Sequence, residues 1–76
     1  MIPDDLTRLR AFRLQAGWTL PEARRQLGCE HSISVRRLSH MERGLDRGWL
    51  ALRRHIAARY GVRPHVLWNG RGDARK

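Results

Sequence analysis

Apolar side chains recur every three or four residues along most of the chain, and runs in which they alternate with polar residues are absent. The first spacing gathers side chains on one side of an α-helix, so the pattern predicts an all-α protein. Glycines separate the periodic segments and predict the ends of four to five short helices. The expected helices cover residues 4–16, 19–28, 34–43 and 49–60, with one further turn at 64–68.

Candidate core positions follow from the same spacing. In the first two expected helices they are Leu6, Leu9, Phe12, Ala16, Ala23 and Leu27. In the fourth they are Trp49, Leu52, Ile56 and Tyr60. The tryptophans at 18, 49 and 68 could stack on single-stranded bases, but each occupies an apolar helical position, which favours packing in the core.

Capping residues mark where the second and third helices begin. Thr19 and Glu22 have the spacing of a capping box, in which the threonine hydroxyl accepts from a first-turn amide and the glutamate reaches back to the cap. Ser34 is the expected cap of the third helix, with Ser32 as the alternative. Residues 69–76 are rich in glycine and charge. We therefore expect one helical domain over residues 1–68 and a disordered basic tail over residues 69–76.

The expected third helix, within the stretch SVRRLSHMERG, has one apolar side and one basic side. Its apolar side consists of Val35, Leu38 and Met41, and its basic side of Arg36, His40 and Arg43. A helix of about nine residues is too short to be stable alone in water, so the apolar side must pack against the preceding helix. The basic side then faces outwards, and arginine on such a helix can donate two hydrogen bonds to guanine in the DNA major groove. A solvated surface helix is the alternative interpretation.

The net charge of +9 is large and unevenly placed. Residues 1–30 hold five arginines against four acids, whereas residues 31–76 hold eleven basic residues against three acids. Fifteen of the sixteen basic residues are arginine, which GC-rich codon usage would explain, but codon usage does not explain the asymmetry. The excess indicates a polyanionic partner, and it favours nucleic acid over an anionic membrane or an acidic protein.

Other chemistry finds little support in the sequence. Cys29 is the single cysteine, so no internal disulfide can form, and a cytoplasmic location is expected. The first residues lack the apolar segment of a signal peptide, and no apolar run approaches the roughly 20 residues that span a bilayer. No nucleophile is paired with a base and no glycine-rich phosphate loop occurs, so we expect neither an enzyme nor a cofactor. Cys29, His31 and His40 match no common zinc spacing, so no metal is expected.

Two motifs resemble the phage-repressor, Cro-like family of helix-turn-helix proteins. Residues 17–28, GWTLPEARRQLG, are similar to its second-helix signature G-L-S-Q-E-E-L-A-x-x-L-G, and residues 38–44, LSHMERG, are similar to its I-S-x-I-E-R-G. The sixteen residues between Gly44 and Gly61 match the family's spacing to its next Gly-Val pair. The resemblance covers residues 6–68 and implies a compact, lambda-repressor-like helical bundle that binds double-stranded DNA.

The resemblance also implies which residues meet DNA. Contacts with bases are expected at Val35, Arg36, Ser39 and His40. Contacts with the backbone or flanking groups are expected at Thr19, Ser34 and Arg43. The family often pairs the equivalents of Arg13 and Glu42, which would tie the first helix to the end of the third as a structural ion pair.

Some positions depart from the family. The loop between Gly28 and Ser34 is about four residues longer than its tight turn, so the third helix is expected to dock at a different angle, with His31 near a phosphate. Leu20 replaces a glutamine that often contacts phosphate, so that contact is expected to be missing. Arg37 fills a position that is usually small, so it is expected to extend outwards and add a contact. Arg47, just before the fourth helix, is a further candidate for a phosphate or the minor groove.

These features predict a sequence-specific DNA-binding transcriptional regulator of bacterial or phage type, with repression by occupancy as the expected mechanism. We expect a homodimer on a near-palindromic site. Candidate dimer contacts are Leu14, Val66, Leu67 and Trp68. The alternatives are a protein-binding adaptor or antitoxin-like module with weak DNA binding, and a basic RNA-binding protein. An adaptor predicts a large exposed apolar patch, and an RNA-binding protein predicts exposed aromatic side chains.

Overall fold

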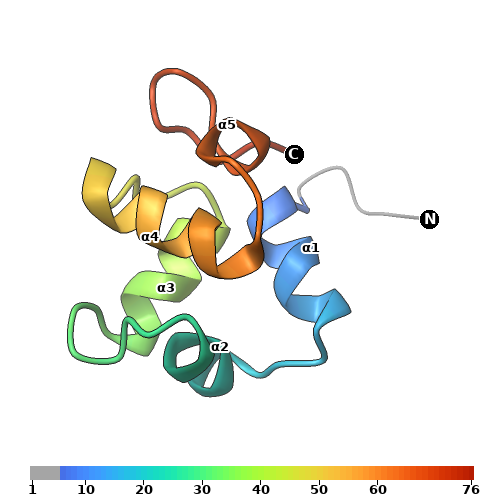
Figure 1. Cartoon of the computed structure of the whole chain (residues 1–76), viewed down its shortest axis with the longest axis vertical. Helices are drawn as coiled ribbons and strands as arrows, with labels where there is room; N and C mark the ends of the chain where they lie inside the picture. Colours follow the sequence, from blue (N-terminus) through green and yellow to red (C-terminus); the bar gives the residue numbers. More distant parts are fainter. Residues whose placement is uncertain (1–5) are drawn as a thin grey trace.

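Five α-helices make up the regular structure of residues 6–76, the part of the chain that the computed structural model describes. They are α1 (Arg8–Gln15), α2 (Leu20–Gln26), α3 (Val35–Glu42), α4 (Leu50–Tyr60) and α5 (Pro64–Leu67). Within this range there is no strand, only a single bridge between Trp68 and Ala74. Figure 1 shows α1 and α3 on opposite sides of the view, with α2 below and α5 above. The all-α fold predicted from the apolar spacing is therefore confirmed.

Thr7 marks the beginning of α1, which corrects the prediction that this helix starts at Asp4 or Asp5, positions that lie outside the described residues. The Thr7 hydroxyl accepts a hydrogen bond of 3.2 Å from the Arg10 amide, so Thr7 is the N-cap. The same hydroxyl donates to the carbonyl oxygen of Glu42 at the end of α3. A residue expected inside the first helix is therefore buried and joins α1 to α3.

Side-chain hydroxyl groups cap the N-termini of α2 and α3 at the predicted residues. Thr19 Oγ1 accepts from the Glu22 amide at 3.3 Å, and Ser34 Oγ accepts from the Arg37 amide at 3.1 Å. The Glu22 carboxylate, however, accepts hydrogen bonds from side chains in the next turn of α2 rather than reaching back to the cap. The capping box predicted for α2 is therefore formed only on its threonine side.

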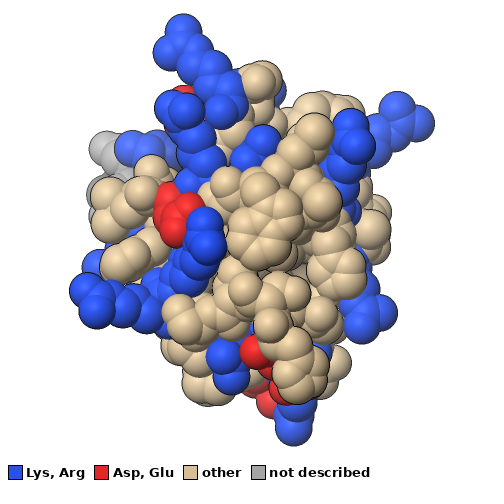
Figure 2. Space-filling view, turned by 90° about the vertical axis from the view of Figure 1, so that its left-hand side faces the viewer, with Lys and Arg blue, Asp and Glu red and all other residues tan. Residues whose placement is uncertain are grey.

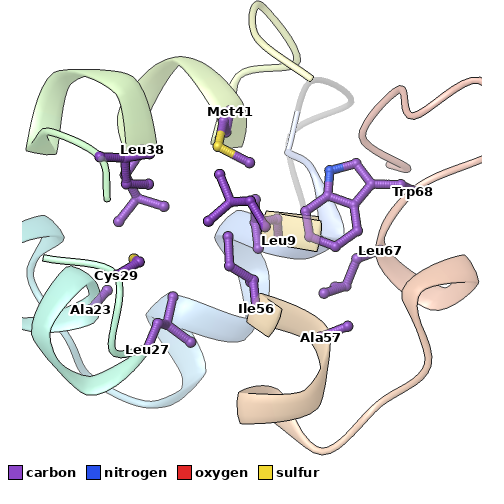
Figure 3. Packing of buried hydrophobic residues seen from close by; sticks show 12 residues of the cluster. Leu9, Ala23, Leu27, Cys29, Leu38, Met41, Ile56, Ala57, Leu67 and Trp68 are labelled. Atoms are coloured by element: carbon purple, nitrogen blue, oxygen red, sulfur yellow. The ribbon is translucent and has the colours of Figure 1, made fainter. Parts of the chain in front are cut away.

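The core gathers apolar side chains from all five helices, and Figure 3 shows them converging between the ribbons. Side chains with no exposed surface include Leu9, Leu38, Met41, Ile56 and Leu67. Trp68 is also buried, and Trp18 stacks on Tyr60 with ring centroids 5.9 Å apart. Trp49 is 42% exposed, so the prediction that it faces inwards is wrong. Ala16, another predicted core residue, is exposed at the end of α1.

Residues 69–76 fold back onto the helices, which differs from the disordered tail expected from their composition (Figure 1). The Arg75 amide donates to the Leu67 carbonyl at 2.8 Å, and the Arg75 carbonyl accepts from the Arg8 amide at 2.7 Å. The Arg8 amide lies in the first turn of α1, where no helical carbonyl is available, so this segment supplies the missing acceptor. The Asn69 side chain accepts from two amides of the intervening turn. These contacts depend on tertiary position and leave no signal in composition.

Gly48, in the loop between α3 and α4, faces the core with a backbone conformation that favours glycine. Its φ is +63°, and a Cβ there would lie 2.9 Å from Met41 Cε and 3.1 Å from Leu52 Cδ2. Gly44, at the other end of the same loop, has φ +78° and nothing within 4 Å of the position of a Cβ. The two glycines therefore share the same backbone cost but differ in steric cost.

Replacing each glycine by alanine should separate these two costs. We expect Gly44→Ala to lower the free energy of unfolding by ~1–2 kcal/mol, because an L-residue is forced into the left-handed region. Gly48→Ala should cost up to a further ~1–3 kcal/mol, because the buried ends of the Met41 and Leu52 side chains must move to admit its methyl group. Urea denaturation of both variants measures the difference. Equal losses would contradict the placement of Gly48 against Met41 and Leu52.

Candidate nucleic-acid interface

α3 has one side buried in the core and one side open to solvent. Leu38 and Met41 are completely buried, and Glu42 is nearly so. The residues of α3 and its C-cap whose side chains are exposed or partly exposed are Val35, Arg36, Arg37, Ser39, His40 and Arg43. All four predicted base-contacting residues therefore lie on one helix with part of their surface accessible.

A buried ion pair holds the end of α3 against α1. Arg13 Nε lies 2.7 Å from Glu42 Oε2 and 2.9 Å from Oε1, and Arg13 also donates to the Trp18 carbonyl at 2.9 Å. This is the pair that the family resemblance implied. Burial raises the pKa of the Glu42 carboxyl above its ordinary value, and the hydrogen bond from Arg13 opposes that rise. The pair is therefore a rigid junction whose desolvation offsets much of its attraction.

Arg37 is engaged within the protein, although the sequence suggested a free side chain near DNA. Its Nε lies 2.9 Å from Asp46 Oδ2, and its guanidinium lies over the Trp49 ring at 5.1 Å from the centroid. Asp46 also accepts from the Gly48 amide at 2.7 Å. The Gly48 hydrogen bond, with Arg37 as a further contribution, lowers the pKa of Asp46. Arg37 therefore joins α3 to the loop that follows it and packs on Trp49.

Arg47 is paired with the C-terminal segment. Its Nε lies 2.8 Å from Asp73 Oδ1, and its carbonyl accepts from Arg53 at 2.8 Å. Local sequence signals do not predict this pair, because the composition of residues 69–76 predicts disorder. By contrast, Arg36 and Arg43 have no acidic partner within residues 6–76. Of the four candidate arginines, Arg37 and Arg47 are therefore paired within the protein. The other two, Arg36 and Arg43, are available to bind a partner.

Thr19 and Ser34 are exposed residues whose hydroxyls serve as helix caps. A hydroxyl that accepts from an amide still has its O–H to donate. Both side chains can therefore cap a helix and bind a phosphate oxygen at the same time.

The long loop between α2 and α3 is anchored by its own apolar residues. Cys29 and Ile33 are buried, and the Ile33 amide donates to the Cys29 carbonyl at 3.0 Å. Arg24 donates from α2 to the Ile33 carbonyl at 3.2 Å. Burial raises the pKa of the Cys29 thiol. The His31 side chain remains 97% exposed at the tip of the loop.

Two functional or structural side chains escaped the sequence analysis. His55 is exposed on α4, and its Nε2 lies 2.7 Å from the Leu27 carbonyl at the end of α2. Arg10, which the sequence did not single out, lines a cleft together with Arg43. Neither contact follows from helical periodicity, because each joins residues from different helices.

Two of the four candidate dimer contacts are buried, and the other two are accessible. Leu67 and Trp68 are buried in the core, so they cannot form a dimer surface in this conformation, and that expectation is wrong. Leu14 is 50% exposed beside an apolar groove along α1, and Val66 is partly exposed. Within residues 6–76, no group of three potential metal ligands occurs, and no helix is long and apolar enough to cross a membrane.

Positive charge extends beyond α3. Figure 2 shows the face that carries the α2–α3 loop and the start of α4, where basic side chains surround a largely uncharged centre and acidic groups are few. Charge alone therefore does not choose a docking face. α3 combines two arginines that form no salt bridge within residues 6–76, Arg36 and Arg43, with an opposite side that is held in the core.

The cost of breaking the buried junction can be measured with single and double substitutions. Glu42→Leu should lower the free energy of unfolding by ~3–5 kcal/mol, because it leaves the Arg13 guanidinium buried without its partner. Adding Arg13→Met should recover a large part of that loss by removing the unpaired charge. Urea denaturation of the single and double variants tests this, and a double variant less stable than Glu42→Leu would contradict it.

Comparisons of this chain with protein-family models, with curated proteins and with solved structures find no match.

Proposed function

We propose that this chain is a sequence-specific double-stranded DNA-binding regulator of transcription, of bacterial or phage type, that places α3 in the major groove. The observation that carries the proposal is the outer side of α3, where Arg36 has no acidic partner within residues 6–76 while the opposite side is locked into the core. Specific readout needs donors held at a fixed angle, and this helix meets that need.

The likeness to a helix-turn-helix supports this orientation. α2 packs against α3, and their connection is the anchored loop that ends at Ser34. In such a motif the second helix enters the groove while the first lies across the backbone. Arg36 would then donate two hydrogen bonds to a guanine, and Thr19 and Arg43 would hold nearby phosphates. Bound protein would act by occupancy, blocking or guiding the polymerase.

A protein-binding adaptor is the second candidate, because several large apolar side chains are exposed. They are Leu14, Leu45, Trp49 and Leu50. Leu14 borders the groove along α1, which is also lined by Ala11 and Phe12. The same groove would suit a second copy of the chain on a near-palindromic site. An adaptor would bind DNA weakly and without sequence preference.

Selection of duplexes from a random pool, followed by binding titrations with Arg36→Ala, tests the proposal. The unsubstituted protein should enrich a motif, and Arg36→Ala should bind that motif ~1–3 kcal/mol more weakly while discriminating less at one base pair. Arg54→Ala, which removes an exposed arginine from α4, is the matched control and should keep the motif. Selection without enrichment would favour the adaptor, and an Arg36→Ala variant with unchanged preference would remove α3 from the groove.

A further inference from the structure

A cleft beside the outer side of α3 brings together charged groups from α1 and α3. It is lined by Arg10, Arg13, Leu20, Ser39, Glu42 and Arg43. An adjoining hollow of about 390 Å³ shares Arg10, Glu42 and Arg43 and continues past Leu45. The cleft volume of about 120 Å³ is roughly four times the volume that one water molecule takes up in the liquid. The cleft therefore has room for a small polyatomic anion such as a phosphate group.

The cleft carries a net positive charge, and only one of its three arginines is paired with an acidic residue. Arg13 and Glu42 neutralise each other in the buried junction at its base. Arg10 and Arg43 are exposed and form no salt bridge within residues 6–76, although the charge of Arg10 acts on the nearby Glu42 and opposes the rise in its pKa. Ser39 adds a hydroxyl that can donate. Two guanidiniums and a hydroxyl around a small cavity form a suitable site for a phosphate group, because arginine binds phosphate through charge-assisted hydrogen bonds.

We propose that this cleft holds one phosphodiester group of the DNA backbone, bound jointly by Arg10 of α1 and Arg43 at the end of α3. This inference rests on the proposed function and adds to it a DNA contact from α1. The Arg13–Glu42 pair holds α1 and the end of α3 together, so the backbone positions of Arg10 and Arg43 are fixed relative to each other. A phosphate held in the cleft therefore sets how α3 lies against the duplex, which gives the contact a role in register as well as affinity.

A phosphate shared by two arginines predicts a smaller change in the salt dependence of binding than two separate phosphates do. Each phosphate that is neutralised changes the slope of log K against log salt concentration by about 0.9 for duplex DNA. If Arg10 and Arg43 bind the same phosphate, removing both should reduce the slope by about 1 in total. Two independent phosphates would reduce it by about 2. The effects of the two substitutions on affinity should also be coupled, because the residues share a partner.

The test is a set of salt titrations on one mixed-sequence duplex, with the protein unsubstituted and as Arg10→Ala, Arg43→Ala and the double variant. Arg63→Ala, an exposed arginine at the start of α5 outside the cleft, is the matched control. Each single cleft variant should weaken every duplex by a similar factor, the double variant should lose about 1 in slope, and Arg63→Ala should change neither quantity. Thermal unfolding of each variant separates lost binding from lost fold.

Three results would overturn the shared site while leaving the proposed function intact: an unchanged affinity of Arg10→Ala, a loss of about 2 in slope for the double variant, or an equal effect of Arg63→Ala. A failure of the unsubstituted protein to bind any duplex would instead overturn the proposed function, and this inference with it.

Discussion

The buried ion pair between Arg13 and Glu42 joins α1 to the last turn of α3, and the direction in which α3 faces depends on it. Thr7 completes the junction, because its hydroxyl caps α1 and donates to the Glu42 carbonyl. An eight-residue helix cannot hold its conformation alone in water, so α3 takes its order from these contacts and from Leu38 and Met41 in the core. The side chains on its outer side are therefore presented at a fixed angle.

The strong positive charge of the chain serves two purposes in this structure. Some arginines organise the protein itself: Arg37 holds Asp46 and covers Trp49, and Arg47 holds the C-terminal segment. Others point outwards without an acidic partner in residues 6–76, as Arg36 does. Net charge makes a polyanion a reasonable partner, and on α3 the available Arg36 stands on a helix whose opposite side is held in the core.

Most of the helices could be predicted from the sequence, because apolar spacing, capping hydroxyls and glycines are local signals. Ser34 caps α3 as expected, and Ile56 lies in the core. The contacts that shape the candidate interface could not be predicted, because they join distant segments. Arg47 meets Asp73 across 26 residues, and the fold of residues 69–76 depends on where α1 places the Arg8 amide. The composition of residues 69–76 predicted disorder, because composition carries no information about tertiary contacts.

The most direct test of the account is an amide chemical-shift map of the labelled protein titrated with duplex DNA. If the outer side of α3 meets DNA, the largest shifts will lie along α3, at the starts of α2 and α3, and around Arg10 in α1. The apolar groove near Leu14 should shift little at a protein concentration where the chain stays monomeric. Shifts confined to that groove or to the exposed side of α4, with α3 unaffected, would contradict the claim that the outer side of α3 is the surface that meets DNA.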